Sequence, residues 1–180
     1  ERRKEDEGLE KSFIGEIISE VEKASPEFVV IAGPGFFKEK LDKKLKEKGF
    51  KTFLEGASSV SEAGLREVFA RGILTRIAGK VREEEEERAV SRVYEEIAKE
   101  GKFFYGFEEA LKLAEEGNIE LLLVSSRFIG DIVSRGKYSL LKELMKKVKY
   151  SRGKILVVGI NRDAEERLLG LGGIAGIRRW

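Results

Sequence analysis

The fold is decided by the stretch Phe28-Val-Val-Ile-Ala-Gly-Pro-Gly-Phe-Phe37. Its first four residues are apolar and three of them are β-branched, which predicts a strand inside a sheet. Glycine and proline at 33–35 end that strand abruptly, and the lysine-rich segment 38–48 predicts a helix directly afterwards. Loops at the carboxyl ends of such strands face the crevice where α/β proteins place their working surfaces. Phe36 on this loop is therefore either a plug for its own core or an anchor for a partner.

Composition excludes several classes of function. The 180 residues include 35 Lys and Arg against 33 Asp and Glu, so the net charge of +2 gives no global case for nucleic-acid binding. The chain has no cysteine and no histidine, which removes disulfides, thiolate-zinc sites and serine–histidine catalysis. No apolar run approaches the length of a membrane span and no signal peptide is visible, so the cytoplasm is the expected compartment. Abundant Lys, Glu and Arg with few thermolabile residues are typical of a heat-adapted source.

Helix and strand patterns alternate along the chain, which predicts the α/β class. Apolar residues at three- and four-residue spacing predict a helix over 9–21, ahead of the opening strand. Ser59-Val-Ser-Glu62 has the form of a capping box, which predicts that a helix starts there and runs to Gly72. Further strands are expected at 50–54, 73–81, 103–105, 119–125, 154–160 and 174–180, and further helices at 89–101, 107–116, 138–150 and 164–169.

Five consecutive glutamates within Arg82–Arg88 mark the most obvious change of composition along the chain. We interpret them as a solvated helix start, favoured by the helix dipole, rather than as a metal site. The chain is therefore expected to form two small α/β domains, 1–82 and 83–180. The regular alternation in the second half predicts a largely parallel sheet with helices on both faces.

Neither glycine loop has the features of a nucleotide site. Gly33-Pro-Gly35 lacks the Gly-Lys-Ser/Thr ending of a phosphate loop, and its proline removes a backbone amide that an anion would need. Leu171–Gly176 leads into a predicted strand, so a tight turn is the better interpretation. Asp131 and Asp163 have no metal-ligand spacing, so we expect no metal site. The residues by themselves predict a non-enzymatic binding module without a cofactor.

Basic residues cluster in two places. The first cluster is Arg2, Arg3 and Lys4, and the second is the segment Lys142–Arg152, which has two tyrosines close by. Most such clusters are solvated helix faces, but these two are the best candidates for contact with phosphate groups.

Three segments occur in an order that carries a family resemblance. They are Phe28-Val-Val-Ile-Ala-Gly-Pro-Gly-Phe-Phe-Lys-Glu39, Phe104-Tyr-Gly-Phe-Glu-Glu-Ala-Leu-Lys-Leu-Ala-Glu-Glu-Gly-Asn-Ile-Glu-Leu-Leu-Leu-Val124 and Leu169-Gly-Leu-Gly-Gly-Ile-Ala-Gly-Ile-Arg178. Over residues 9–180 the chain resembles the central and C-terminal domains of archaeal Pelota, the ribosome-rescue relative of class 1 release factors. Because it begins at Glu1 without an initiator Met, we expect a fragment of a longer protein. The resemblance also implies that the second domain is a three-layer α/β/α sandwich like the ribosomal proteins that bind kink-turn RNA.

The resemblance implies a role in translation quality control, in no-go and non-stop mRNA surveillance. Such a factor recognises stalled ribosomes in a tRNA-like manner with an elongation-factor-like GTPase, and promotes ribosome dissociation with an ABC-type ATPase. It implies that Pro34, Gly35 and Phe36 bind the GTPase, and that the basic residues at 2–4 lie near a loop that contacts ribosomal RNA. It also implies a monomeric archaeal protein that needs no cofactor and no membrane.

Two alternatives stay open. Class 1 peptide release depends on a Gly-Gly-Gln loop, and this chain contains no glutamine, so it can release peptide only with a loop that precedes it. The kink-turn-binding proteins carry Gly-x-Asn-Glu where this chain has Gly106-Phe-Glu-Glu109, and the missing asparagine argues against base-specific RNA contact. A mainly protein-binding role fits these residues better.

Overall fold

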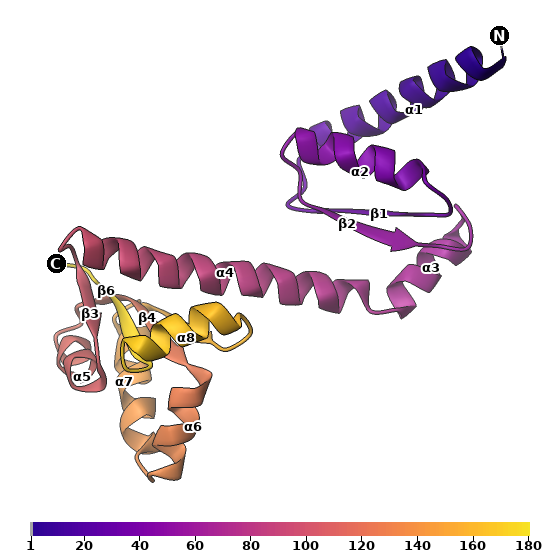
Figure 1. Ribbon diagram of the computed structural model, residues 1–180. Helices are drawn as coiled ribbons and strands as arrows, with labels where there is room; N and C mark the ends of the chain where they lie inside the picture. Colours follow the sequence, from indigo (N-terminus) through magenta and orange to yellow (C-terminus); the bar gives the residue numbers. More distant parts are fainter. Residues whose placement is uncertain (1) are drawn as a thin grey trace. The chain divides into compact units, whose positions relative to one another are not determined.

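The computed structural model describes the backbone of residues 2–180 and the side chains of residues 8–180. The chain divides into two compact units, Glu1–Ile77 and Ala78–Trp180. Both units combine helices with a small sheet, which confirms the expected α/β class. Figure 1 shows that the division falls within one continuous helix, α4 (Ile73–Ala98), which also contains the boundary expected at residue 82.

The first unit is built on a two-stranded parallel sheet. Its elements are α1 (Arg2–Ala24), β1 (Val29–Gly33), α2 (Phe37–Glu47), β2 (Thr52–Gly56) and α3 (Glu62–Ala70), followed by the start of α4. Strand β1 pairs with β2 in register from Val29 opposite Thr52 to Gly33 opposite Gly56. Helix α2 makes the crossover that a parallel pair requires.

One hydrophobic core joins α1, α2 and β1. Apolar residues three or four positions apart lie on one side of each helix, so each helix buries a single stripe. The buried members are Ile14, Ile18, Ile31, Leu41 and Leu45. The expected apolar face of α1 is only partly covered, because Leu9 is 70% exposed and Phe13 is 54% exposed.

The predicted capping box does not form. Helix α3 begins only at Glu62, and Ser61 occupies the N-cap position without a side-chain hydrogen bond to the helix. The hydroxyl groups of Ser59 and Ser61 lie 2.7 Å apart and bond to each other instead of to the first-turn amides.

The segment Ile73–Val81, expected as a strand, forms the first turns of α4. Ile73 and Ile77 are one helical turn apart and only 1% and 3% exposed, so a helix buries both of them on one side. The local preference of this segment for a strand is weak, and tertiary packing overrides it.

The second unit contains a four-stranded sheet in the order β3-β6-β4-β5. Its elements after α4 are β3 (Phe103–Tyr105), α5 (Phe107–Glu115), β4 (Ile119–Ser125), α6 (Ser126–Ser134), α7 (Tyr138–Tyr150), β5 (Lys154–Val158), α8 (Arg162–Gly170) and β6 (Ile174–Arg178). The expected largely parallel sheet is wrong, because only β4 and β5 are parallel and β6 runs antiparallel to both of its neighbours. The reason lies in the last turn, where the N–H of Ser125 donates to the carbonyl of Gly173 at 2.8 Å. Strand β6 therefore starts where β4 ends and runs back along it.

The sheet lies between two helical layers, as Figure 1 shows. Leu122 and Val124 of β4 pack on one face with α5 and α7, whereas Leu121 and Leu123 pack on the other face with α4 and α8. This alternation follows from the two-residue period of a strand. It confirms the expected three-layer α/β/α sandwich.

The run of five glutamates is not a solvated helix start. It lies inside α4, and Glu86 is only 1% exposed. One oxygen of Glu86 accepts hydrogen bonds from the backbone N–H groups of Gly159, Ile160 and Asn161 at 3.0, 2.9 and 2.9 Å. The other oxygen lies 3.5 Å from Nε of Arg82. Glu86 therefore holds the loop between β5 and α8 against α4.

Candidate partner-docking site

The loop Gly33–Phe36 projects from the carboxyl end of β1. Gly35 has a φ of 69°, a left-handed conformation that glycine adopts without strain. The turn places Phe36 at the N-cap position of α2 with 85% of its surface exposed. Phe36 is therefore not a plug for its own core. That role belongs to Phe37, which packs against the core with its ring centroid 5.7 Å from that of Phe13.

Lys38 fixes the shape of this loop. Its ammonium group donates to the carbonyl oxygen of Gly35 at 2.9 Å and to that of Gly33 at 3.3 Å. Its side chain is only 18% exposed, so these bonds are partly shielded from water. The first turn of α2 thus holds both ends of the turn that presents Phe36.

A second loop, residues 57–61, follows the carboxyl end of β2. It lies at the same end of the sheet as the first loop, because β1 and β2 are parallel. The N–H of Ala57 donates to the carbonyl of Gly33 at 3.4 Å, which joins the two loops. Val60 in this second loop is 89% exposed. We call Pro34, Gly35, Phe36 and Val60 the docking edge.

The second loop is held by a charged group of α3. The carboxylate of Glu67 accepts a hydrogen bond from the N–H of Ser58 at 3.0 Å, and this bond holds the pKa of Glu67 below its ordinary value. The guanidinium of Arg71 donates to the carbonyl of Gly56 at the end of β2. Because Glu67 stays ionised at neutral pH, the loop keeps this support under physiological conditions.

Only part of the docking edge could be predicted from the sequence. The loop with Phe36 stands out because a strand ends there in Gly-Pro-Gly, but Val60 was missed. Its one signal is that it is an isolated apolar residue among three serines, Ser58, Ser59 and Ser61. Single exposed apolar side chains are common on protein surfaces, and they indicate an interaction site only when the fold groups them together.

The docking edge offers apolar contact and backbone groups, but no nucleophile with a neighbouring base. Among the side chains that the structure describes, no three acidic residues are grouped closely enough to hold a metal ion. Asp131 and Asp163 lie on separate helices, α6 and α8. At 171–176, Gly172 and Gly173 have φ values of 88° and 79° and form the expected tight turn into β6. The docking edge therefore offers exposed apolar surface that suits contact with a macromolecule.

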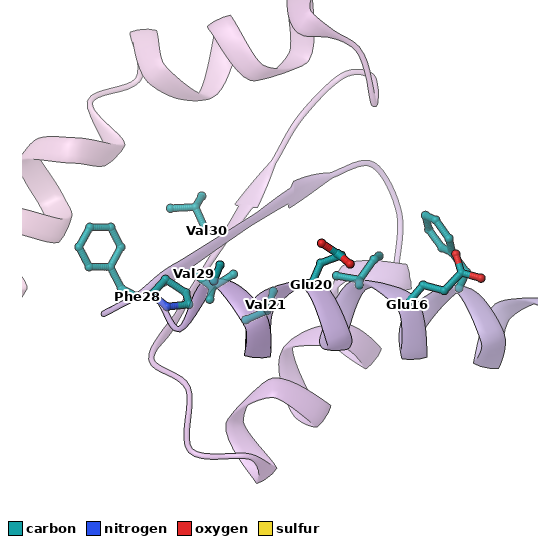
Figure 2. A pocket seen from close by; sticks show the side chains of 10 residues that line it. Glu16, Glu20, Val21, Phe28, Val29 and Val30 are labelled. Atoms are coloured by element: carbon teal, nitrogen blue, oxygen red, sulfur yellow. The ribbon is translucent and has the colours of Figure 1, made fainter.

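A groove of about 590 Å³ runs between α1 and the open edge of β1 (Figure 2). Its lining is mostly apolar and consists of Phe13, Glu16, Ile17, Glu20, Val21, Ala24, Pro26, Phe28, Val29 and Val30. The N–H of Val29 donates to Lys51 at 2.8 Å beside β2, so the backbone groups of Val30 point the other way, toward the groove. Within the part of the chain that the structure describes, β1 pairs only with β2 and has no strand on this side, so the expectation that it lies inside a sheet is wrong.

The other candidate contacts are placed as follows. Arg2, Arg3 and Lys4 lie in the first turns of α1, and their side chains fall outside the described residues. At the start of α5, the side chain of Phe107 packs into the core with its ring centroid 5.9 Å from that of Phe128. Phe107 therefore fills the variable position of the Gly-x-Asn-Glu signature, and Glu108, which stands where that signature has its asparagine, is exposed and acidic.

The second unit corresponds to a known protein family. Residues 84–180 match the family described as eRF1 domain 3. The chain belongs to the eRF1 domain 3 family. Among curated proteins, the pelota homolog of Methanocella arvoryzae is 32% identical over 173 residues, which are 93% of this chain and 48% of that protein. The chain thus spans about half the length of the curated relatives it matches.

Solved structures of Pelota proteins share the fold of this member of the eRF1 domain 3 family. The crystal structure of Archaeoglobus fulgidus Pelota gives a TM-score of 0.80 at 31% identity, over 93% of this chain and 53% of that one. A structure of ribosome-bound archaeal Pelota with ABCE1 gives 0.62 at 28% identity, over 98% and 50%. Dom34 of S. cerevisiae, a termination-like factor that interacts with Hbs1, gives 0.57 at 25% identity, over 97% and 53%. The resemblance to Pelota drawn from the sequence is confirmed.

Proposed function

We propose that the chain is the central and C-terminal part of a ribosome-rescue factor of the Pelota type. In this role it recognises stalled ribosomes in a tRNA-like manner together with a translational GTPase, and it promotes ribosome dissociation in no-go and non-stop mRNA surveillance. The observation that carries the proposal is the similarity to Pelota proteins along nearly the whole chain, in sequence and in fold. A role on the ribosome is supported by the structure of ribosome-bound archaeal Pelota, which shares the fold at 28% identity.

The two parts of the chain have different partners in this proposal. Residues 1–82 form the part that meets an elongation-factor-like GTPase, and the docking edge is the contact surface. Residues 83–180 form the part that meets an ABC-type ribosome-splitting ATPase. The division is supported by the family match, which starts at residue 84. The partners are supported by Dom34, which interacts with Hbs1, and by the archaeal Pelota structure that includes ABCE1.

The proposed factor is not an enzyme. It acts as a monomer in the cytoplasm, where ribosomes translate, and it needs no cofactor. The composition supports this, since the chain has neither histidine nor cysteine to supply the commonest general base or a thiol nucleophile. No helix in the described residues is long and apolar enough to cross a membrane. The proposed ribosomal RNA contact at Arg2, Arg3 and Lys4 rests on the family resemblance alone.

Binding to the GTPase tests the proposal. The chain is mixed with an elongation-factor-like GTPase that carries a non-hydrolysable GTP analogue, and the affinity is measured by titration calorimetry. Phe36→Ala removes an exposed aromatic anchor of the kind that dominates protein interfaces, so we expect binding to weaken by about thirtyfold. The matched control is Trp180→Ala, which removes an aromatic ring that is 66% exposed in the second unit and leaves binding unchanged.

Two results would overturn the proposal. In the first, the wild-type chain does not bind the GTPase in either nucleotide state. In the second, the full-length protein releases peptide from peptidyl-tRNA, which is the activity of a class 1 release factor. Wild-type binding that survives Phe36→Ala unchanged removes the loop from the interface and contradicts the assignment of Pro34, Gly35 and Phe36.

A further inference from the structure

Helix α7 has a buried face, and its opposite face carries a stripe of lysines. Leu141, Leu144 and Val148 are fully buried against the sheet. Lys142, Lys146 and Lys149 are spaced four and three residues apart, so they form one stripe on the outer side, and all three are exposed. The stripe is continued beyond the helix by Arg152, which is also exposed.

Positive charge is concentrated on this part of the chain and is not neutralised there. Residues 135–152 contain seven Lys and Arg but only one acidic residue, Glu143, although the whole chain has a net charge of only +2. Among the described side chains, only Lys147 of these seven cations pairs with a carboxylate, that of Glu115 at 3.0 Å. Many basic residues elsewhere are paired, including Arg82, Arg92 and Arg167. The unpaired stripe therefore attracts anions more strongly than the overall charge suggests.

An exposed aromatic ring stands at the end of the stripe. Tyr150, the last residue of α7, is 94% exposed, although a tyrosine ring normally buries much of its apolar surface. Beside it lies a hollow of about 550 Å³ between the ends of α5 and α7, lined by Ala114, Glu115, Gly117, Lys146, Lys147, Tyr150 and Ser151. The hollow is large enough for a planar ring, and its one carboxylate is already paired with Lys147.

The combination of lysines with a free aromatic ring favours RNA over other anionic partners. Lysines contact phosphates without regard to sequence, and an exposed tyrosine stacks on a base that is not paired. A membrane surface would require an apolar face on α7 to insert, but that face is buried in the core of the unit. An acidic protein segment would use the lysines and leave Tyr150 without a contact.

We propose that Lys142, Lys146, Lys149, Tyr150 and Arg152, the α7 basic face, bind an unpaired segment of RNA. The cations contact successive phosphates, and Tyr150 stacks on one base at the mouth of the hollow. The inference deepens the proposed function, on which its biological setting rests, because it gives the second unit its own contact with ribosomal RNA.

The test measures fluorescence anisotropy of a short labelled single-stranded RNA with the 180-residue chain over a range of salt concentrations. The triple variant Lys142→Glu/Lys146→Glu/Lys149→Glu is expected to bind at least about tenfold more weakly at low salt. The slope of log affinity against log salt is expected to fall by about 2, since each contact with a single-strand phosphate contributes about 0.7. Tyr150→Ala is expected to weaken binding by about fivefold or more without changing the salt slope.

A control of equal charge change separates this face from a general effect of charge. Lys11→Glu/Lys43→Glu/Lys44→Glu alters three exposed lysines of the first unit and is expected to keep wild-type affinity. Circular dichroism melting of every variant checks that the fold is kept.

The inference is overturned if the α7 triple variant binds like wild type or if the control loses as much affinity. It is also overturned if polyglutamate or anionic vesicles bind the chain more tightly than RNA. Because the assay contains neither ribosomes nor a GTPase, its failure leaves the proposed function standing. Conversely, an absence of GTPase binding leaves this result unaffected.

Discussion

The carboxylate of Glu86 in α4 accepts a hydrogen bond from the backbone N–H of Asn161, 75 residues later in the chain, at 2.9 Å. Asn161 in turn caps α8, because its side-chain oxygen accepts from the N–H of Ala164 at 3.0 Å. One buried glutamate therefore fixes the loop that starts the last helix of the second unit. The neighbouring amides of Gly159 and Ile160 share the same acceptor oxygen.

Removal of this acceptor is expected to destabilise the second unit strongly. Glu86→Ala leaves three backbone N–H groups facing a cavity, so we expect the free energy of unfolding to fall by about 3 kcal/mol. Glu86→Gln keeps an oxygen but loses the charge, and about half of that loss is expected. Urea unfolding followed by circular dichroism measures both values.

The control for Glu86 is a glutamate in the same run. Glu83→Ala removes only a partly exposed pair with Lys80, so a change below about 0.5 kcal/mol is expected. An equal loss for Glu83→Ala and Glu86→Ala would mean that the charge of the run, rather than the buried contact, stabilises the unit.

A second buried carboxylate, that of Glu165, makes the stability of the second unit depend on pH in the acid range. Burial acts to raise the pKa of Glu165, but hydrogen bonds from Ser126, from the N–H of Arg127 and from Ser125 outweigh burial and hold the pKa below its ordinary value of 4.5. Since the folded pKa lies below the unfolded one, this stabilisation is complete above pH 4.5 and is lost as the pH falls through the folded pKa.

Glu165→Gln is therefore expected to flatten the acid side of the stability profile. The free energy of unfolding of the wild type should fall more steeply below pH 4.5 than that of the variant. Ser126→Ala removes one of the donors and should give an intermediate slope. Urea titrations at a series of pH values measure the three slopes, and identical slopes would contradict a role of Glu165 in acid sensitivity.

Local patterns were enough to predict the opening strand, its Gly-Pro-Gly turn and most helices of the second unit. The opening strand was predicted from an unbroken apolar run, and a helix such as Leu141–Val148 was predicted from the three- to four-residue spacing of the apolar side chains that face the core. The exposure of Phe36 could not be predicted in this way. Phe36 and Phe37 are adjacent and chemically identical, and only the left-handed turn at Gly35 decides which of them points outward.

The features that were missed depend on contacts between distant residues. The burial of Glu86 requires amides that lie more than 70 residues later in the chain, and the antiparallel direction of β6 depends on the bond between Ser125 and Gly173. Helix α6 was not expected, because Ser125 was read only as the end of a strand. In the structure its hydroxyl accepts from the N–H groups of Arg127 and Phe128 and starts the helix directly.

Lys38 is expected to control how firmly Phe36 is presented. Lys38→Met keeps the apolar part of the side chain but removes the hydrogen bonds to the carbonyls of Gly33 and Gly35. We expect faster amide hydrogen exchange in the loop and binding to the GTPase that is about fivefold weaker, which corresponds to about 1 kcal/mol. Lys40→Met is the control, because Lys40 pairs with Glu10 on α1 and does not contact the loop carbonyls. Equal exchange rates in both variants would show that the turn holds its shape without Lys38.

The last prediction concerns the second loop of the docking edge. Val60 contacts little of its own unit, since it is 89% exposed, so Val60→Asp should leave the melting temperature unchanged. If the GTPase covers both loops, the new carboxylate is buried without a partner in the complex, and binding should weaken by about tenfold or more. Val60→Thr keeps the shape and adds only a hydroxyl, so a smaller loss is expected and serves as the matched control. The affinities are measured with the same GTPase complex as for Phe36→Ala. Unchanged binding by Val60→Asp would restrict the interface to Pro34, Gly35 and Phe36.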